Sequence, residues 1–154
     1  EAAEVEGAVR FWGLTGRSIA GLRFYAKNRG LDWRATAVQY SPGNIEEFLE
    51  VTASRTERVA EMFDLEIGLD ETDLTVLEDY RGPAYGVPDD RTIEAILMVG
   101  KAEGLILDPN YTGKSMSGLI GELRAGRIDP DETICFIHSG GLPQLFAHAD
   151  RFVD

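Results

Sequence analysis

Three short segments of the sequence combine hydroxyl side chains with glycines, a composition typical of loops that contact a ligand. They are GLTGRSIAG at residues 13–21, DPNYTGKSMSGL at residues 108–119 and CFIHSGGLP at residues 135–143. In the first segment, Thr15, Gly16 and Ser18 stand where a strand gives way to a helix, and a helix N-terminus favours a phosphate. The spacing fits neither a P-loop nor a dinucleotide-binding fingerprint. A plain tight turn is therefore the alternative interpretation of this segment.

The other two segments add a phenol and a further hydroxyl. Tyr111 stands at the entrance of a predicted helix, where its phenol could reach a ligand or could pack its ring and expose its tip. Ser139 comes directly after an apolar strand and before paired glycines, which allow a close approach of the backbone. The only histidines, His138 and His148, lack partners at metal-ligand spacing, so no metal site is expected.

The composition is that of one folded domain covering residues 1–154. Hydrophobic residues make up 44% of the chain and charged residues 27%, as in ordinary globular proteins. The formal net charge of −12 disfavours nucleic acid as a partner. The sequence has no apolar run long enough to span a membrane, and its single cysteine suits a reducing compartment, so a cytoplasmic protein is expected.

Strand-like and helix-like segments alternate along the chain. Strands are expected near residues 8–12, 34–40, 74–77 and 133–137, and helices near residues 18–28, 45–63 and 113–125, with two more beginning near residues 90 and 143. This alternation predicts an α/β fold in three layers, a mostly parallel sheet with helices on both faces. Ligands of such sheets bind at the carboxyl ends of the strands, and the three segments are expected to meet there.

Taken in order, with GPAYGVP at residues 82–88 between the first and the second, the segments resemble a known enzyme family. They are similar to the C-terminal half of the D-cysteine desulfhydrase and 1-aminocyclopropane-1-carboxylate (ACC) deaminase family. The resemblance runs from about residue 8 to residue 148 and is most specific at residues 85–118 and at HSGGLPQLF, residues 138–146. It implies a pyridoxal-phosphate (PLP) enzyme of fold type II, with a tryptophan-synthase-β-like large domain. It also implies a small amino acid as substrate and a homodimer as the intact enzyme.

The resemblance assigns roles to particular residues of the first two segments and of the loop between them. Thr15, Gly16 and Ser18 match positions that bind the cofactor phosphate, which agrees with the interpretation of that loop from its own residues. Arg17 departs from the small residue that the family usually has there. Two active-site tyrosines that flank the substrate in the family are matched by Tyr85 and Tyr111, the predicted catalytic residues.

Two hydroxyl residues separate the branches of the family. Ser139 matches a hydroxyl that the desulfhydrase branch places against the pyridine nitrogen, and Thr112 replaces the glutamate of the deaminase branch. A neutral hydroxyl leaves the ring a weaker electron sink than a carboxylate would, which suffices for β-elimination of a good leaving group. The resemblance therefore favours a lyase of the D-cysteine desulfhydrase type, which releases pyruvate and ammonia. An ACC deaminase, or a non-catalytic domain that binds PLP or phosphate, is the alternative.

The lysines do not match the family's catalytic lysine. The resemblance places the Schiff-base lysine in an N-terminal half that this sequence does not contain. Only Lys27, Lys101 and Lys114 are present, and Lys114 matches the helix motif. The chain is therefore expected to be the C-terminal portion of the PLP-binding large domain and an inactive fragment when isolated.

Overall fold

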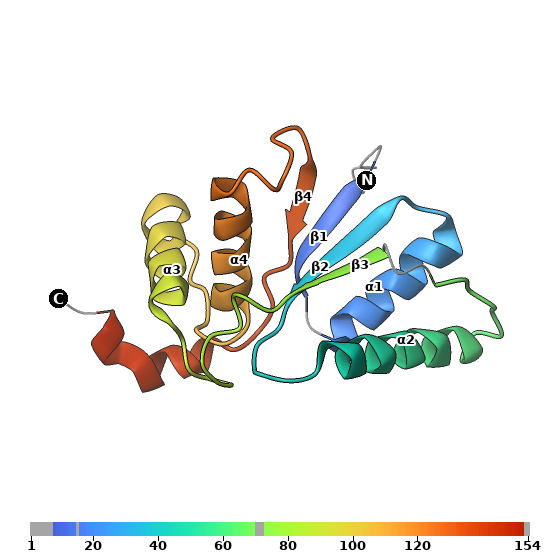
Figure 1. Ribbon diagram of the computed structural model, residues 1–154, viewed down its shortest axis with the longest axis horizontal. Coiled ribbons are helices and arrows are strands. Elements are labelled where there is room, and N and C mark those ends of the chain that lie inside the picture. The colour runs from blue at the N-terminus through green and yellow to red at the C-terminus, as the bar shows by residue number, and fades with distance from the viewer. Residues whose placement is uncertain (1–7, 15, 70–72, 153–154) are drawn as a thin grey trace.

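A parallel sheet lies between two layers of helices (Figure 1). The computed structural model describes residues 8–14, 16–69 and 73–152. In chain order the elements are β1 (Val9–Leu14), α1 (Gly16–Arg29), β2 (Trp33–Val38), α2 (Ile45–Glu61), β3 (Leu74–Leu77), α3 (Asp90–Glu103), α4 (Thr112–Arg124), β4 (Thr133–Phe136) and the 3₁₀ helix η2 (Leu142–Arg151). The strand order is β3-β2-β1-β4, and every pair is parallel. The three-layer α/β fold predicted from the sequence is confirmed.

The two faces of the sheet are covered by different helices. On one face lie α1 and α2, and Ile19 packs there with Ala35 and Ala37. On the other face lies α4, where Trp12, 1% exposed, packs with Leu119. Helix α3 packs on α4. Each crossover thus places a helix N-terminus near the carboxyl edge of the sheet, where the parallel strands end.

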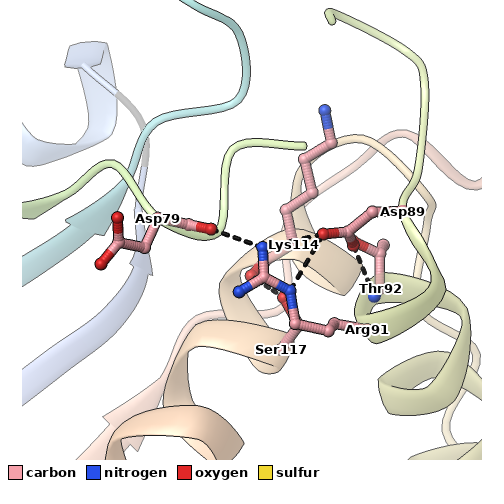
Figure 2. Close-up of polar contacts among 6 residues, drawn as sticks. All are labelled: Asp79, Asp89, Arg91, Thr92, Lys114 and Ser117. Carbon is pink, nitrogen blue, oxygen red and sulfur yellow. Dashed lines mark hydrogen bonds and ion pairs between the residues drawn. The ribbon is translucent and has the colours of Figure 1, made fainter. Parts of the chain in front are cut away.

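Two helices begin where the sequence predicts, because a side chain caps each of them. Asn44 Oδ1 accepts hydrogen bonds from the N–H groups of Glu46 and Glu47, at 2.7 and 3.3 Å, at the start of α2. Asp89 Oδ1 accepts from the N–H and the hydroxyl of Thr92, at 2.9 and 2.7 Å, at the start of α3 (Figure 2). Such caps satisfy N–H groups that the first turn of a helix leaves unpaired.

The second segment differs from the first and the third in what precedes it. Residues 105–107 form no strand, and Leu105 and Ile106 are 52% and 61% exposed, so the second segment does not follow a strand of the sheet. Leu105 and Ile106 line a surface groove, whereas Leu107 is completely buried in the core with Ile96 and Val99. None of the described helices combines the length and the apolar character needed to cross a bilayer.

Candidate active site

Two glycines bring the three segments together at the carboxyl edge of the sheet. A Cβ on Gly13, whose φ is +89°, would lie 2.7 Å from the carbonyl oxygen of Ile137, so the ends of β1 and β4 touch there. A Cβ on Gly141, whose φ is +108°, would lie 2.6 Å from Asp108 Oδ2. Only glycine fits such backbone conformations at such close approach. The third segment therefore borders both the first and the second.

The N-terminus of α1 is suited to an anion. The helix begins at Gly16 and has no acidic residue in its first turn, while Arg17 and Ser18 are exposed. First-turn N–H groups and the helix dipole both favour negative charge at this position. Thr15 lies outside the described residues. The roles of Thr15, Gly16 and Ser18 as phosphate ligands stay predictions.

The buried carboxylate of Asp108 organises the start of α4. Its Oδ2 accepts hydrogen bonds from the N–H groups of Asn110 and Tyr111, both at 2.8 Å. Its Oδ1 accepts from the N–H and the hydroxyl of Thr112, both at 2.7 Å, and that hydroxyl in turn accepts from the Asp108 N–H at 2.8 Å. The single proton of the Thr112 hydroxyl is thus used within the turn. Its predicted contact with a cofactor stays a prediction.

Three tyrosine rings form a cluster beside this turn. The two predicted catalytic residues, Tyr85 and Tyr111, share a hydrogen bond between their phenol oxygens, and their ring centroids are 6.0 Å apart. Tyr40, from the carboxyl end of β2, lies edge-on to both rings at 5.8 and 5.5 Å. Edge-to-face contacts of this kind hold aromatic rings in fixed orientations. The tyrosine cluster, Tyr40 with Tyr85 and Tyr111, therefore presents preorganised phenols.

The pairing changes the acidity of Tyr111. The hydrogen bond with Tyr85 and, secondarily, burial raise the pKa of Tyr111 to about 12, and the Asn110 amide slightly opposes this rise. Tyr111 is therefore protonated at neutral pH, and its phenol is a weaker acid than that of a free tyrosine. A general base would need the opposite shift, toward neutrality.

Lys114 connects two loops beneath the tyrosine cluster. Its side chain is completely buried, and its Nζ donates to the carbonyl oxygens of Tyr40 and Ala84 at 2.9 and 2.8 Å. Desolvation lowers the pKa of Lys114 to about 8, although the charges of Asp89 and Asp108 oppose this shift. In Figure 2 the amine points away from Asp89. Lys114 thus fixes the backbone that carries the cluster.

Asn110 and His148 hold the residue that follows Tyr85. Asn110 Oδ1 accepts from the Gly86 N–H at 2.7 Å, and His148 Nε2 lies 2.8 Å from the Gly86 carbonyl oxygen. Asn110 is completely buried, and its Nδ2 makes no hydrogen bond of normal geometry with any described residue. A buried amide N–H without a partner is rare and calls for an acceptor from a ligand or water.

Ser139 lies in the loop that leaves β4. The residue is exposed, and no hydrogen bond joins its hydroxyl to the described part of the chain. The next residue toward β4, His138, places Nε2 at 2.9 Å from the Ile106 carbonyl oxygen. The structure thus pairs Tyr85 with Tyr111, whereas Ser18, in the first turn of α1, and Ser139, in the loop after β4, make no hydrogen bond with them. Within the described ranges, no three His, Cys, Asp or Glu side chains are placed to share a metal ion.

Comparison with known proteins decides the family. The model of the family described as "Pyridoxal-phosphate dependent enzyme" matches residues 13–140, from the first segment into the third. The chain belongs to this family. Its members use PLP as cofactor, as the resemblance in the sequence implies.

Relatives of known activity fall into two groups. An ACC deaminase of Burkholderia ambifaria is 37% identical over 146 residues, which cover 90% of this chain and 41% of that protein. A D-cysteine desulfhydrase of Salmonella newport is 47% identical over 76 residues, which cover 49% of this chain and 23% of that protein. A crystal structure of an ACC deaminase homologue superposes with a TM-score of 0.80 at 26% identity, covering 97% of this chain and 44% of that chain. The chain thus spans less than half the length of the relatives it matches.

The residues at this edge fit the PLP of the family. A phosphate would find a helix start free of acidic side chains at α1. A polar ring substituent would find the phenols of the cluster and the hydroxyl of Ser139. The nearby carboxylate of Asp108 already accepts four hydrogen bonds, so it repels an anionic ligand less than a bare carboxylate would.

Four residues of this site were not found from the sequence. Tyr40 ends a predicted strand, and that position alone could have marked it as a site residue. Asp108 precedes Pro and Asn before a helix, a pattern in which an Asp side chain often bonds backbone N–H groups. Asn110 and Lys114 carry no comparable signal, because their partners are 24 to 74 residues away along the chain.

Proposed function

We propose that this chain supplies one wall of the active site of a PLP-dependent lyase of the D-cysteine desulfhydrase type. The reaction is β-elimination from a small sulfur-containing amino acid, with release of pyruvate, ammonia and the sulfur leaving group. PLP, when bound, draws electrons away from the substrate α-carbon. The observation that carries the proposal is the hydrogen-bonded pair of Tyr85 and Tyr111 beside an open helix start at α1.

The tyrosine pair acts as a hydrogen-bond donor in this proposal. Tyr85 is 51% exposed, so its phenol can meet a substrate, and Tyr111 stands behind it with a pKa raised to about 12. A leaving sulfur gains negative charge as its bond to carbon breaks, and a phenol O–H can stabilise that charge by donating a hydrogen bond to it. Tyr40 and Lys114 position the pair and do not touch the reacting atoms.

Hydroxyl side chains at positions 112 and 139 favour this branch over the deaminase. The Thr112 hydroxyl is already bonded to Asp108, so we assign the pyridine nitrogen to the Ser139 hydroxyl. A neutral hydroxyl does not hold a proton on that nitrogen as a carboxylate would. This suits the departure of hydrosulfide, a good leaving group, better than the opening of a cyclopropane.

The lysines support a role within a longer enzyme. Lys114 is buried and bonded to two carbonyl oxygens, Lys27 is paired with Asp73 at 2.7 Å, and Lys101 is exposed on α3. None of them is a free amine beside the tyrosine cluster. We therefore propose that the Schiff-base lysine comes from another part of the enzyme and that the isolated chain is inactive. Borohydride reduction of the chain with PLP should leave no stoichiometric pyridoxyl-lysine in peptide mass spectra, and a full adduct on Lys114 would contradict this.

An apolar groove offers a surface for the remainder of such an enzyme. It lies between α3 and η2, has a volume of about 410 Å³, and exposes Leu105, Ile106 and Phe146 by 52, 61 and 85%. Contiguous apolar surface of this kind marks interaction sites in soluble proteins. We propose that the rest of the polypeptide covers this groove. We also propose that the intact enzyme is a homodimer, and light scattering of the intact enzyme tests its oligomeric state.

ACC deaminase activity is the second candidate, because the Burkholderia relative covers 90% of this chain. Two chimaeras separate the candidates. In each, this chain replaces the aligned segment of one relative, the Salmonella desulfhydrase or the Burkholderia deaminase, so that the relative supplies the lysine. The proposal expects pyruvate from D-cysteine in the first chimaera, with loss of activity in its Tyr85→Phe variant, and little turnover of ACC in either. Turnover of ACC alone would establish the second candidate, and two folded but inactive chimaeras would contradict both.

A further inference from the structure

A second hollow lies on the face of the sheet opposite the tyrosine cluster. Its volume is about 320 Å³, within the range of small-molecule sites, and it opens between the turn after β2 and the first half of α2. Its walls include Gln39, Tyr40, Asn44, Glu47, Phe48 and Arg55. Nothing in the proposed reaction uses this hollow.

Gln39 directly follows β2 and continues its alternation, because the Gln39 N–H still bonds the Leu77 carbonyl oxygen of β3 at 3.0 Å. Ala35 and Ala37 pack with Ile19, and Phe48 of α2 packs against the same group. Successive side chains of a strand point to opposite faces, so Gln39 lies on the α2 face and Tyr40 on the α4 face. Tyr40 accordingly joins the tyrosine cluster while its backbone borders the hollow.

Gln39 provides a hydrogen-bond acceptor without a partner. The residue is only 4% exposed, and its Oε1 is buried without a hydrogen bond to any described residue. A buried acceptor in this state is costly unless a ligand or a water donates to it. The hollow therefore has a specific place for an N–H or O–H donor.

Arg55 provides a cation at the other end of the hollow. Its guanidinium makes no ion pair or hydrogen bond with the described residues, although the chain carries 27 acidic against 15 basic side chains. The opposite end, at the start of α2, carries Glu46 and Glu47. Phe48 lies between these ends and gives the wall an apolar patch. The hollow thus presents an acceptor end and a cationic end joined by an apolar surface.

We propose that this hollow binds a small free amino acid as a zwitterion, with its ammonium group donating to Gln39 Oε1 and its carboxylate bound by Arg55. A 2-oxo acid would satisfy the guanidinium and leave the buried acceptor unpaired. A simple amine would satisfy the acceptor and leave the guanidinium without an anion. Only a ligand that carries both groups matches both ends, and charge-assisted bonds at both ends make the match selective.

The test measures binding to the chain without PLP, so its outcome is independent of the proposed reaction. L-Alanine and D-alanine are titrated in separate experiments and followed by amide chemical shifts, with pyruvate and ethylamine as probes that keep one charged group each. We expect at least one alanine enantiomer to bind in the millimolar range and to shift the amides of residues 39–48. Pyruvate and ethylamine should bind at least about tenfold more weakly, the loss expected for one charged hydrogen-bonded group.

Three variants locate the site. Gln39→Met keeps the side-chain size but removes the acceptor, and Arg55→Met removes the cation; each should weaken alanine binding by about tenfold or more. Gln39→Met should leave the melting temperature unchanged or raised, because it removes an unpaired buried polar atom, so weaker binding is not a sign of unfolding. The matched control is Arg58→Met, one turn further along α2 and exposed, which should not change binding.

Absence of binding by both alanine enantiomers would overturn the proposal. Equal affinity for pyruvate and alanine would also overturn it, because the site would then recognise a carboxylate alone. Binding that survives both Gln39→Met and Arg55→Met would place the ligand elsewhere.

Discussion

The starts of α4 and α1 border the same candidate site and are built in opposite ways. At α4, the buried carboxylate of Asp108 accepts four hydrogen bonds from the residues that open the helix. At α1, the first turn contains Gly16, Arg17 and Ser18 and no acidic side chain. One helix start is satisfied by the protein itself, and the other is suited to an external anion.

This difference divides the site into a fixed part and a receiving part. The turn at α4 holds Tyr111 in place before any ligand arrives, and Lys114 does the same for the backbone of Tyr40. The turn at α1 gains a partner for its N–H groups only when an anion binds. Substitutions at α4 should therefore change folding, whereas substitutions at α1 should change binding.

The largest effect is expected from Asp108→Ala. Removal of the carboxylate leaves three N–H groups and one hydroxyl in a buried turn without their acceptor, so the free energy of unfolding should fall by about 3–5 kcal/mol. Urea denaturation measures the change. The control is Asp129→Ala, an exposed aspartate that accepts from one N–H group at 3.0 Å, and should cost no more than about 1 kcal/mol. An equal fall in the free energy of unfolding in the two variants would contradict the division of the site into a fixed part and a receiving part.

Lys114→Met should destabilise the chain by about 2 kcal/mol. It should also remove a pH dependence of the free energy of unfolding. In the folded chain the pKa of Lys114 is about 8, against an ordinary value of 10.5. Between these values the unfolded chain binds more protons than the folded one, so the free energy of unfolding rises with pH across this window. This gain is lost again as the pH falls through 8.

The measurement is the difference in unfolding free energy between the two proteins from pH 7.5 to pH 10.5. The original chain should gain on the order of 1–3 kcal/mol relative to the variant across this range. Parallel pH profiles would show that Lys114 is not desolvated as described.

Tyr85→Phe should lower the pKa of Tyr111 toward its ordinary value near 10. The hydrogen bond between the two phenols is the first cause of the raised pKa of Tyr111, and the variant removes that bond without removing the ring. Ultraviolet titration of phenolate absorbance checks this. Tyr25→Phe, at an exposed tyrosine on α1, serves as the control and should leave the high titration of Tyr111 in place. Persistence of the high titration in the Tyr85 variant would mean that burial alone causes it.

Ser18→Asp tests the receiving part and has the smallest expected effect. A negative charge in the first turn of α1 should stabilise the helix by about 0.5 kcal/mol while weakening the binding of a phosphate by about fivefold. Pyridoxamine phosphate is the probe, because its amine cannot form a Schiff base with surface lysines. Ser18→Ala provides the uncharged control. Unchanged affinity in the aspartate variant would move the phosphate away from α1.

The sequence predicts the layers and several helix boundaries, because these depend on local patterns. Asn44 and Asp89 cap α2 and α3 as their residue types indicate. The segment from 105 to 107 is ambiguous, since a short apolar run does not reveal which of its residues enter the core, as Leu107 does, and which line a groove, as Leu105 and Ile106 do.

The site is predicted only in part, for a physical reason. The assignment of Tyr85 and Tyr111 came from family resemblance, and their shared hydrogen bond joins residues 26 apart. Lys114 bonds a carbonyl 74 residues away, and nothing in the local sequence selects that partner. Tertiary packing decides such contacts, so single-sequence reasoning places the segments without fixing their hydrogen bonds.

The most direct test of the central claim is a titration of the isolated chain with pyridoxamine phosphate, followed by amide chemical shifts. If the three segments and the tyrosine cluster form one site for PLP, then residues 16–18, 85–86, 110–112 and 138–141 should shift together and saturate with a single dissociation constant. Shifts restricted to one of these groups, or a different dissociation constant for each, would contradict it.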